Sequence, residues 1–154
     1  MSGQQGVVTT CEASWTAAIV AHLEIAGSGG LRYPSRRAGP ATVLARHDYP
    51  AAGSYLSLFY DEPAAARYVK RLRQEPMSKF KARDIFRASG LSLLGISNSH
   101  VEHDRKKILA GKSLSPLLLV RAPNNQRVII ADGYHRMCAV YSFDEDALIP
   151  CKIV

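Results

Sequence analysis

The sequence predicts an α+β fold in which a small mixed β-sheet is flanked by helices. Short apolar runs at 116–120 and 127–131, together with a closing run at 149–154, are typical of buried strands. The stretches before and between these runs carry apolar residues at helical spacing instead. Hydrophobic residues make up 47% of the 154 residues, which is enough for one domain with its own core. The formal net charge of +7 is compatible with an anionic ligand or a nucleic acid.

Residues 1–43 differ in composition from the rest of the chain. They are rich in Gly, Ser, Ala and Thr and include "GSGG" at 27–30, which predicts a partly flexible N-terminal extension with one short helix near 12–26. The predicted domain spans 44–154. The chain shows neither a secretory signal nor an apolar stretch of membrane-spanning length, and its odd number of cysteines indicates free thiols. We therefore expect a cytoplasmic protein without a membrane partner.

The first part of the domain is expected to be mainly helical. "SYLSLFY", 54–60, is either a strand or a short buried helix. Asp61 is typical of an N-cap, and with Pro63 in the first turn it predicts a helix that runs to about Gln74. A shorter helix is predicted over 80–90, where the last residue, a glycine, serves as its C-cap.

The second part of the domain is expected to alternate helices with strands. Asn98 or Ser99 is expected to cap a helix over about 100–110. Two of the strands that follow are apolar runs rather than alternating ones, which indicates burial on both faces of the sheet. The elements expected after that helix are strands at 116–120 and 127–131, a helix at 133–143 and a closing strand at 149–154.

The segment Asp132-Gly133-Tyr134-His135-Arg136 joins a predicted strand to a predicted helix. Free N–H groups and the helix dipole at such a turn favour an anion, above all a phosphate. Gly133 allows close approach of the backbone, Arg136 can grip phosphate oxygens, and His135 can donate a hydrogen bond or transfer a proton. Asp132 can accept a proton from a substrate hydroxyl or hold a metal ion.

An ordinary structural explanation of this turn is equally compatible with its residue types. In that reading Asp132 is the helix N-cap, His135 and Arg136 are surface residues, and Tyr134 packs in the core. Two cationic side chains in a first turn oppose the helix dipole, however. The location of two cationic side chains in the first turn favours the hypothesis that an anion binds between them.

The order of motifs in the C-terminal half resembles a known family. "ILAGKSLSPLLLV", "VIIADGYHRMCAVY" and "IPCKIV" follow one another as in the ParB/sulfiredoxin-like superfamily, of the ParB-like nuclease domain type. The resemblance covers about 98–154 and implies a nucleotide site in which the turn 132–136 holds phosphates. It also implies that polar residues of the preceding helix take part. These fall on His100, His103 and Lys107, which share one helix face, although a solvated face is the ordinary alternative.

Two departures from the family pattern limit the function that the resemblance implies. Tyr134 stands where sulfiredoxins have their reactive cysteine, and Cys138 lies one turn later on the face expected to be buried. The sequence also shows no helix-turn-helix signature of the DNA-binding domain that ParB proteins carry. A related free-serine kinase has a similar turn, so phosphoryl transfer or hydrolysis of a nucleoside triphosphate (NTP) is the expected reaction class if the protein is an enzyme.

The resulting hypothesis is a nucleotide-binding protein whose ligand is ATP or another NTP with Mg²⁺. Asp132 and His135 are the candidate catalytic residues. A four-residue metal site formed by His100, His103, Asp132 and His135 is conceivable, but Mg²⁺ arriving with the nucleotide is preferred because zinc-like spacings are absent. The candidate nucleotide-binding residues are Gly133, Tyr134, His135, Arg136, His100, His103 and Lys107.

A second hypothesis is a nucleic-acid-binding or nuclease-like module that uses the basic stretch 67–87. Its candidate contacts to the phosphate backbone are Arg67, Lys70, Arg71 and Arg73. The ordinary alternative is the solvated face of two amphipathic helices.

At the start of the predicted domain, His47 and Asp48 either border the nucleotide pocket or belong to a turn before Pro50.

Overall fold

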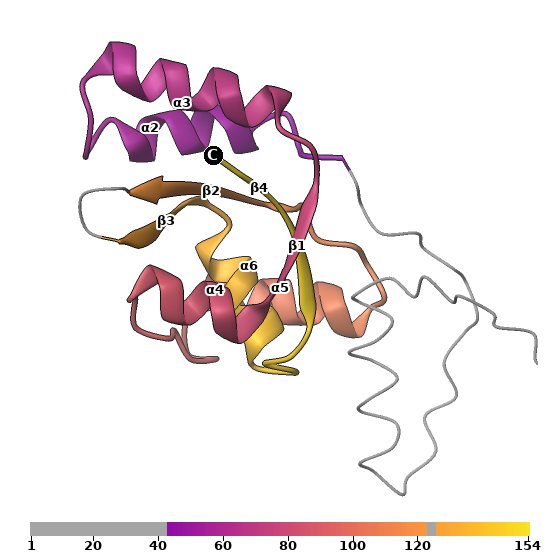
Figure 1. Cartoon of the computed structure of the whole chain (residues 1–154). Coiled ribbons are helices and arrows are strands. Elements are labelled where there is room, and N and C mark those ends of the chain that lie inside the picture. Colours follow the sequence, from indigo (N-terminus) through magenta and orange to yellow (C-terminus); the bar gives the residue numbers. More distant parts are fainter. Residues whose placement is uncertain (1–42, 123–125) are drawn as a thin grey trace, which may run out of the picture.

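The computed structural model describes residues 43–122 and 126–154. Within them a mixed four-stranded sheet lies between two layers of helices, so the predicted architecture of a small mixed sheet flanked by helices is confirmed (Figure 1). The predicted extension, with its helix near 12–26, lies outside the described residues except for Val43. None of the helices in the described part is long and apolar enough to cross a membrane.

The sheet has the strand order β1-β4-β2-β3. β2 is parallel to β4 and antiparallel to β3, and β1 is antiparallel to β4. Leu117 and Leu119 of the central strand β2 belong to one core cluster, and Leu118 and Val120 belong to the other. Burial of both faces of β2, predicted from its apolar run, is thereby confirmed. The strands are β1 Ser78–Lys81, β2 Leu117–Ala122, β3 Arg127–Asp132 and β4 Leu148–Ile153.

Each face of the sheet is covered by its own helical layer. The core on the α2–α3 side includes Leu56 and Leu72, and the core on the other side includes Ile108 and Met137. All four side chains are fully buried, which removes their apolar surface from water and drives the layers together. The helices are α2 Asp48–Leu56 and α3 Glu62–Gln74 on one face, and α4 Ala82–Ser89, α5 Ser99–Leu109 and α6 Tyr134–Tyr141 on the other (Figure 1).

Two local predictions differ from the structure. The segment 54–60 is neither a complete strand nor a complete helix, because α2 begins at Asp48 and ends at Leu56. Pro50 lies in the first turn of α2, where its missing N–H removes no intrahelical hydrogen bond. The second difference is β1, a four-residue edge strand with two exposed central residues that the sequence did not predict. The helix expected over 80–90 therefore begins later, at Ala82.

Three predicted helix ends are confirmed. Asp61 Oδ1 accepts a hydrogen bond of 2.8 Å from the Ala64 N–H, and Gly90 ends α4 with a φ of 64°. Asn98 Oδ1 accepts hydrogen bonds from the N–H groups of His100, at 3.0 Å, and Val101, at 3.3 Å. The Asn98 cap fixes where α5 begins, and hence which of its residues face the start of α6.

We expect Asn98→Ala to lower the free energy of unfolding by about 1 kcal/mol, because two N–H groups of α5 lose their acceptor. Urea denaturation monitored by circular dichroism measures this loss. Asn98→Asp is the matched control, since a carboxylate at this position accepts the same hydrogen bonds and should retain most of the stability. An equal loss in both variants would contradict the capping role.

Candidate functional site

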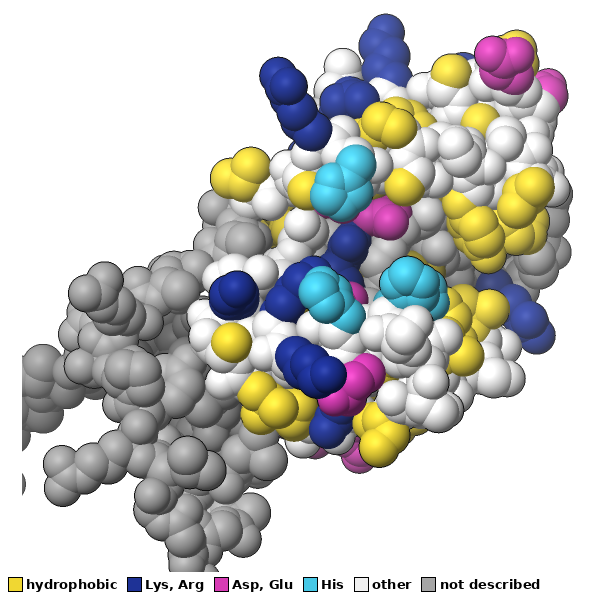
Figure 2. Space-filling model, turned by 180° about the vertical axis from the view of Figure 1, so that it is seen from behind, with side chains coloured by type: hydrophobic (Ala, Val, Ile, Leu, Met, Phe, Trp, Pro, Cys, Tyr) yellow, Lys and Arg dark blue, Asp and Glu magenta, His cyan; other side chains and the backbone are white. Residues whose placement is uncertain are grey.

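A polar hollow of about 240 Å³ lies between α5 and the turn that starts α6. It contains all of the residues proposed from the sequence for nucleotide binding, together with Asp132. Figure 2 shows His side chains gathered with Lys and Arg side chains on one face of the molecule. The residues that line the hollow are His100, His103, Asp104, Lys107, Asp132, Gly133, Tyr134, His135 and Arg136.

The turn at the end of β3 depends on a bulge and on a glycine. Leu118 pairs with Asp132 whereas Leu119 pairs with Ile130, so one extra residue of β3 shifts the register next to the hollow. Gly133 has a φ of 99°, and a Cβ at this position would collide with the Leu117 side chain. This backbone conformation allows β3 to turn directly into α6.

The N-terminus of α6 has no side-chain cap. Gly133 occupies the N-cap position, so the alternative in which Asp132 caps the helix is wrong. The first N–H groups of an α-helix have no acceptor within the helix. In α6 they belong to the residues that form one wall of the hollow, and they are available to an anion there.

Arg136 is held between two carboxylates. Its Nη2 lies 2.6 Å from Asp132 Oδ2, and its Nη1 lies 3.6 Å from Oδ1 of Asp48. Nη2 also donates a hydrogen bond of 3.3 Å to the Pro116 carbonyl. The Asp48 side chain is 0% exposed, and its Oδ2 accepts a 2.6 Å hydrogen bond from the Ala45 N–H. Arg136 is therefore a countercharge inside the protein as well as a lining residue.

The position of Asp48 in the structure was the least predictable from the sequence among the residues of this region. It begins α2 on the opposite side of the sheet and does not line the hollow, whereas its neighbour His47 is 81% exposed. Within the described residues, Asp48 Oδ1 and Arg136 Nε have no hydrogen-bond partner. Its position before Pro50 was compatible with a turn, but a helix begins there instead. No local pattern in the sequence reveals its distant partner Arg136.

The carboxyl group of Asp132 has a raised pKa. Burial is the largest cause, and the nearby Asp48 adds to the increase, while the guanidinium of Arg136 acts in the opposite direction. A carboxyl whose pKa is moved toward neutrality is better matched to proton transfer than an exposed one. The structure thus gives Asp132 a feature expected of an acid or base, although its ion pair with Arg136 occupies one of its oxygens.

His135 has a lowered pKa in the ligand-free site. Burial is the largest cause, followed by the like charge of His100, while Asp104 acts in the opposite direction. At neutral pH its imidazole is therefore mainly uncharged. The two cationic side chains of the first turn favour an anion less strongly than expected, because Arg136 is paired with Asp132 and the lowered pKa of His135 favours its uncharged form.

The face of α5 predicted to carry donors lies along the hollow. His100 and His103 are exposed, and Lys107 is half-buried. Lys107 Nζ lies 2.9 Å from Oδ1 of Asp104, a buried carboxylate that the sequence analysis did not select. The spacing of three residues from Asp104 to Lys107 was the available signal. This face therefore carries one compensated charge and two imidazoles.

The described residues contain no group of three or more His, Cys, Asp or Glu side chains placed to hold a metal ion. The conceivable four-residue site, with His100, His103 and His135 around Asp132, is therefore not assembled in the structure. Both carboxylates that line the hollow, Asp104 and Asp132, already have a cationic partner. An oxygen-preferring ion such as Mg²⁺ would thus take most of its ligands from a bound nucleotide.

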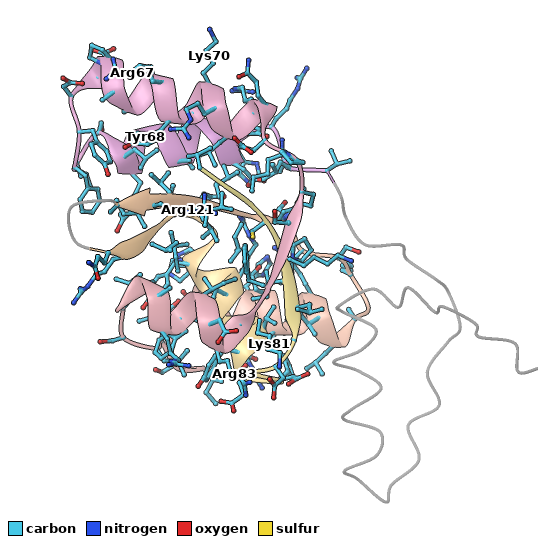
Figure 3. The ribbon with its side chains drawn as sticks, viewed as in Figure 1. Arg67, Tyr68, Lys70, Lys81, Arg83 and Arg121 are labelled. Atoms are coloured by element: carbon cyan, nitrogen blue, oxygen red, sulfur yellow. The ribbon has the colours of Figure 1, made fainter. Side chains whose placement is uncertain are left out.

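The basic stretch 67–87 is divided between two surfaces. Lys81 and Arg83 lie 2.9 Å and 3.0 Å from Asp146 Oδ1, on the side of the lower helical layer. Figure 3 shows Arg67 and Lys70 on α3 at the opposite side of the sheet. The exposed basic residues of α3, none of which forms an ion pair with a described carboxylate, are Arg67, Lys70, Arg71 and Arg73.

Comparisons with protein-family models, with curated proteins and with solved structures give no match. A proposed function of this chain therefore rests on the hydrogen-bond donors, the ion pairs and the size of the hollow. The resemblance found in the sequence remains a hypothesis.

We expect Arg136→Met to lower the free energy of unfolding by about 3–5 kcal/mol, because the buried carboxylate of Asp48 loses its countercharge. Urea denaturation at pH 7 measures the loss. Adding Asp48→Asn in the same chain should recover part of the stability, since the uncompensated charge is then gone.

Arg87→Met is the control for this experiment. Arg87 is 79% exposed and lies 4.0 Å from Asp84, so its removal should change stability little. If Arg136→Met were as harmless as Arg87→Met, the buried network would not stabilise the fold.

Proposed function

We propose that the hollow between α5 and α6 binds the phosphate groups of a nucleotide, ATP or another NTP with Mg²⁺. The observation that carries the proposal is the convergence of two sets of donors on one hollow. One set is the uncapped N-terminus of α6 behind Gly133, and the other is the α5 face with His100, His103 and Lys107. Backbone N–H groups, imidazoles and an ammonium group are all donors that recognise phosphate oxygens.

The fold supports the same proposal at a coarser level. A mixed sheet covered by helices, with a strand-to-helix turn at one end, is the arrangement that the resemblance implies. We propose on this basis that residues 44–154 form a ParB/sulfiredoxin-like domain. The nucleotide, rather than a protein-borne sulfur group, is then the ligand to test first, because Tyr134 occupies the position of the sulfiredoxin cysteine.

The charges of the hollow determine how an anion would be held. Lys107 is paired with Asp104, and Arg136 is paired with Asp132 and Asp48, so the ion pairs leave little net positive charge. His135 is the lining imidazole whose pKa is lowered in the ligand-free site. A bound anion favours its protonated form, so phosphate binding should be accompanied by proton uptake at this residue.

If the protein is an enzyme, phosphoryl transfer or NTP hydrolysis is the reaction class that this site supports best. Catalysis of that class relies on positioning and on charge stabilisation rather than on covalent chemistry. Asp132, whose pKa is raised by burial, is the candidate base toward an attacking hydroxyl or water, and His135 is the candidate donor to a phosphate oxygen. Mg²⁺ would supply further neutralisation of the phosphate charge.

We expect ATP affinity to rise about tenfold between pH 7.5 and pH 5.5, measured by calorimetric titration alongside CTP and GTP. The pKa of His135 is lowered below 6.5, so its imidazole gains charge only as the pH falls, and a bound anion favours that charged form. His135→Gln should remove much of this pH dependence. Because ATP itself gains protons over the same range, the variant and the wild type are compared at each pH.

His47→Gln is the matched control, since His47 is exposed and lies outside the hollow. The same pH dependence in His135→Gln as in wild type would remove His135 from the site. Absence of binding by ATP, CTP and GTP at either pH would overturn the proposal.

A second candidate function, nucleic-acid binding, is favoured by one observation, the exposed basic residues of α3 without described ion pairs. We expect any DNA affinity from this surface to fall steeply with salt concentration, because cationic contacts to phosphates release counterions. Fluorescence anisotropy with a labelled duplex at 50 and 200 mM salt measures it. Combined Arg67→Gln and Lys70→Gln should weaken DNA binding, whereas His103→Gln should weaken only nucleotide binding. DNA binding that is insensitive to salt would contradict this assignment.

A further inference from the structure

Three aromatic rings form a row along the hollow. The rings of Tyr134 and His135 have centroids 5.8 Å apart with an interplanar angle of 45°. The rings of His135 and His100 have centroids 4.9 Å apart with an interplanar angle of 38°. Tyr134 and His135 begin α6, and His100 begins α5, so the row crosses from one helix to the other. All three side chains line the hollow.

The ring of Tyr134 is held at the edge of the core. Its hydroxyl donates a hydrogen bond to the Ser92 carbonyl, and its ring packs against the core cluster below while the residue stays half-buried. Tyr55 of α2, which is 36% exposed, lies near enough to contribute to the raised pKa of Tyr134, after burial and Cys138. The hydrogen bond to Ser92 and the contact with the core therefore hold the Tyr134 side chain in place, while part of the residue remains exposed to solvent.

The hollow is large enough for the phosphate groups of a nucleotide but small for the whole molecule. Pockets that enclose a whole drug-sized ligand usually measure roughly 300–1,000 Å³. The hollow measures about 240 Å³, which is below that range and suits phosphate groups. A nucleoside attached to those phosphates would extend out of the hollow, and the rings at its edge are the nearest π-surfaces.

We propose that the ring row Tyr134–His135–His100 is the platform on which the base of the nucleotide stacks. The inference rests on the proposed function and adds to it the place where the base of the nucleotide is bound. Aromatic faces bind any base, because every base presents a π-face. Tyr134 is the member of the row expected to contribute most to binding the base, since its ring lies at the end of the row away from α5 and carries no charge at neutral pH.

Calorimetric titration of the full chain at pH 6 with ATP and with inorganic tripolyphosphate tests this platform. Both ligands present a chain of three phosphates, but only ATP carries a nucleoside with its base. Wild type should bind ATP at least about tenfold more tightly than tripolyphosphate, in keeping with the effect of one base stacked on an aromatic ring. Tyr134→Leu should remove that preference while leaving tripolyphosphate affinity within about twofold.

Two further variants separate stacking from loss of structure. Tyr134→Phe keeps the ring and loses the hydrogen bond to Ser92, so it should retain most of the preference for ATP. Tyr141→Leu is the matched control on the same helix, because its ring packs on Phe86 and it is not among the lining residues of the hollow. It should leave both affinities unchanged.

The outcomes distinguish the platform from the phosphate site. Equal wild-type affinities for ATP and tripolyphosphate would overturn the platform and leave phosphate binding standing, even if Tyr134→Leu did not fold. A preference for ATP that survives in Tyr134→Leu would also overturn it. Failure of wild type to bind either ligand would overturn the proposed function itself.

Discussion

The ion pairs of Arg136 with Asp132 and Asp48 are the interaction on which the arrangement of the site depends. They join α6, the end of β3 and the first residue of α2, and these two helices lie on opposite faces of the sheet to which β3 belongs. A buried carboxylate without a countercharge is strongly unfavourable, so the folded chain has to bring these elements together at one position. The same contact lies next to the turn at Gly133, whose conformation depends on the β3 bulge and on the glycine. Charge compensation, bulge and glycine thus act together at the wall of the hollow that α6 forms.

Charge compensation also explains how the hollow can be selective. An exposed cluster of cations, such as the one on α3, attracts any polyanion and is screened by salt. In the hollow Lys107 and Arg136 are paired, and uncharged donors remain: the imidazole of His135, whose pKa is lowered by burial, and the N–H groups of α6. Uncharged donors stabilise an anion only when it lies at hydrogen-bonding distance. The geometry of the ligand therefore matters more for binding than the total charge of the hollow. This is why we prefer the hollow over α3 as the functional site.

The sequence predicted the parts of the structure that local chemistry determines. Helix ends at Asp61, Asn98 and Gly90 follow from short-range hydrogen bonds and backbone conformation, and the apolar run of β2 follows from its burial. The donor face of α5 follows from helical spacing. The edge strand β1 is too short and too polar to show a pattern. The pairing of Asp48 with Arg136 joins residues far apart in the chain, which no local period encodes.

The two described thiols are not available as reactive groups. Burial raises the pKa of the Cys138 thiol, and it raises that of Cys151 to about 12. Both side chains are fully buried, so at neutral pH these two described thiols are protonated and inaccessible. A cysteine in the position of Tyr134 would have been half-exposed beside an uncapped helix N-terminus, where a thiolate is stabilised. With a tyrosine there, the same position offers a ring in place of a nucleophile, and it is suited to recognising a ligand rather than to attacking one.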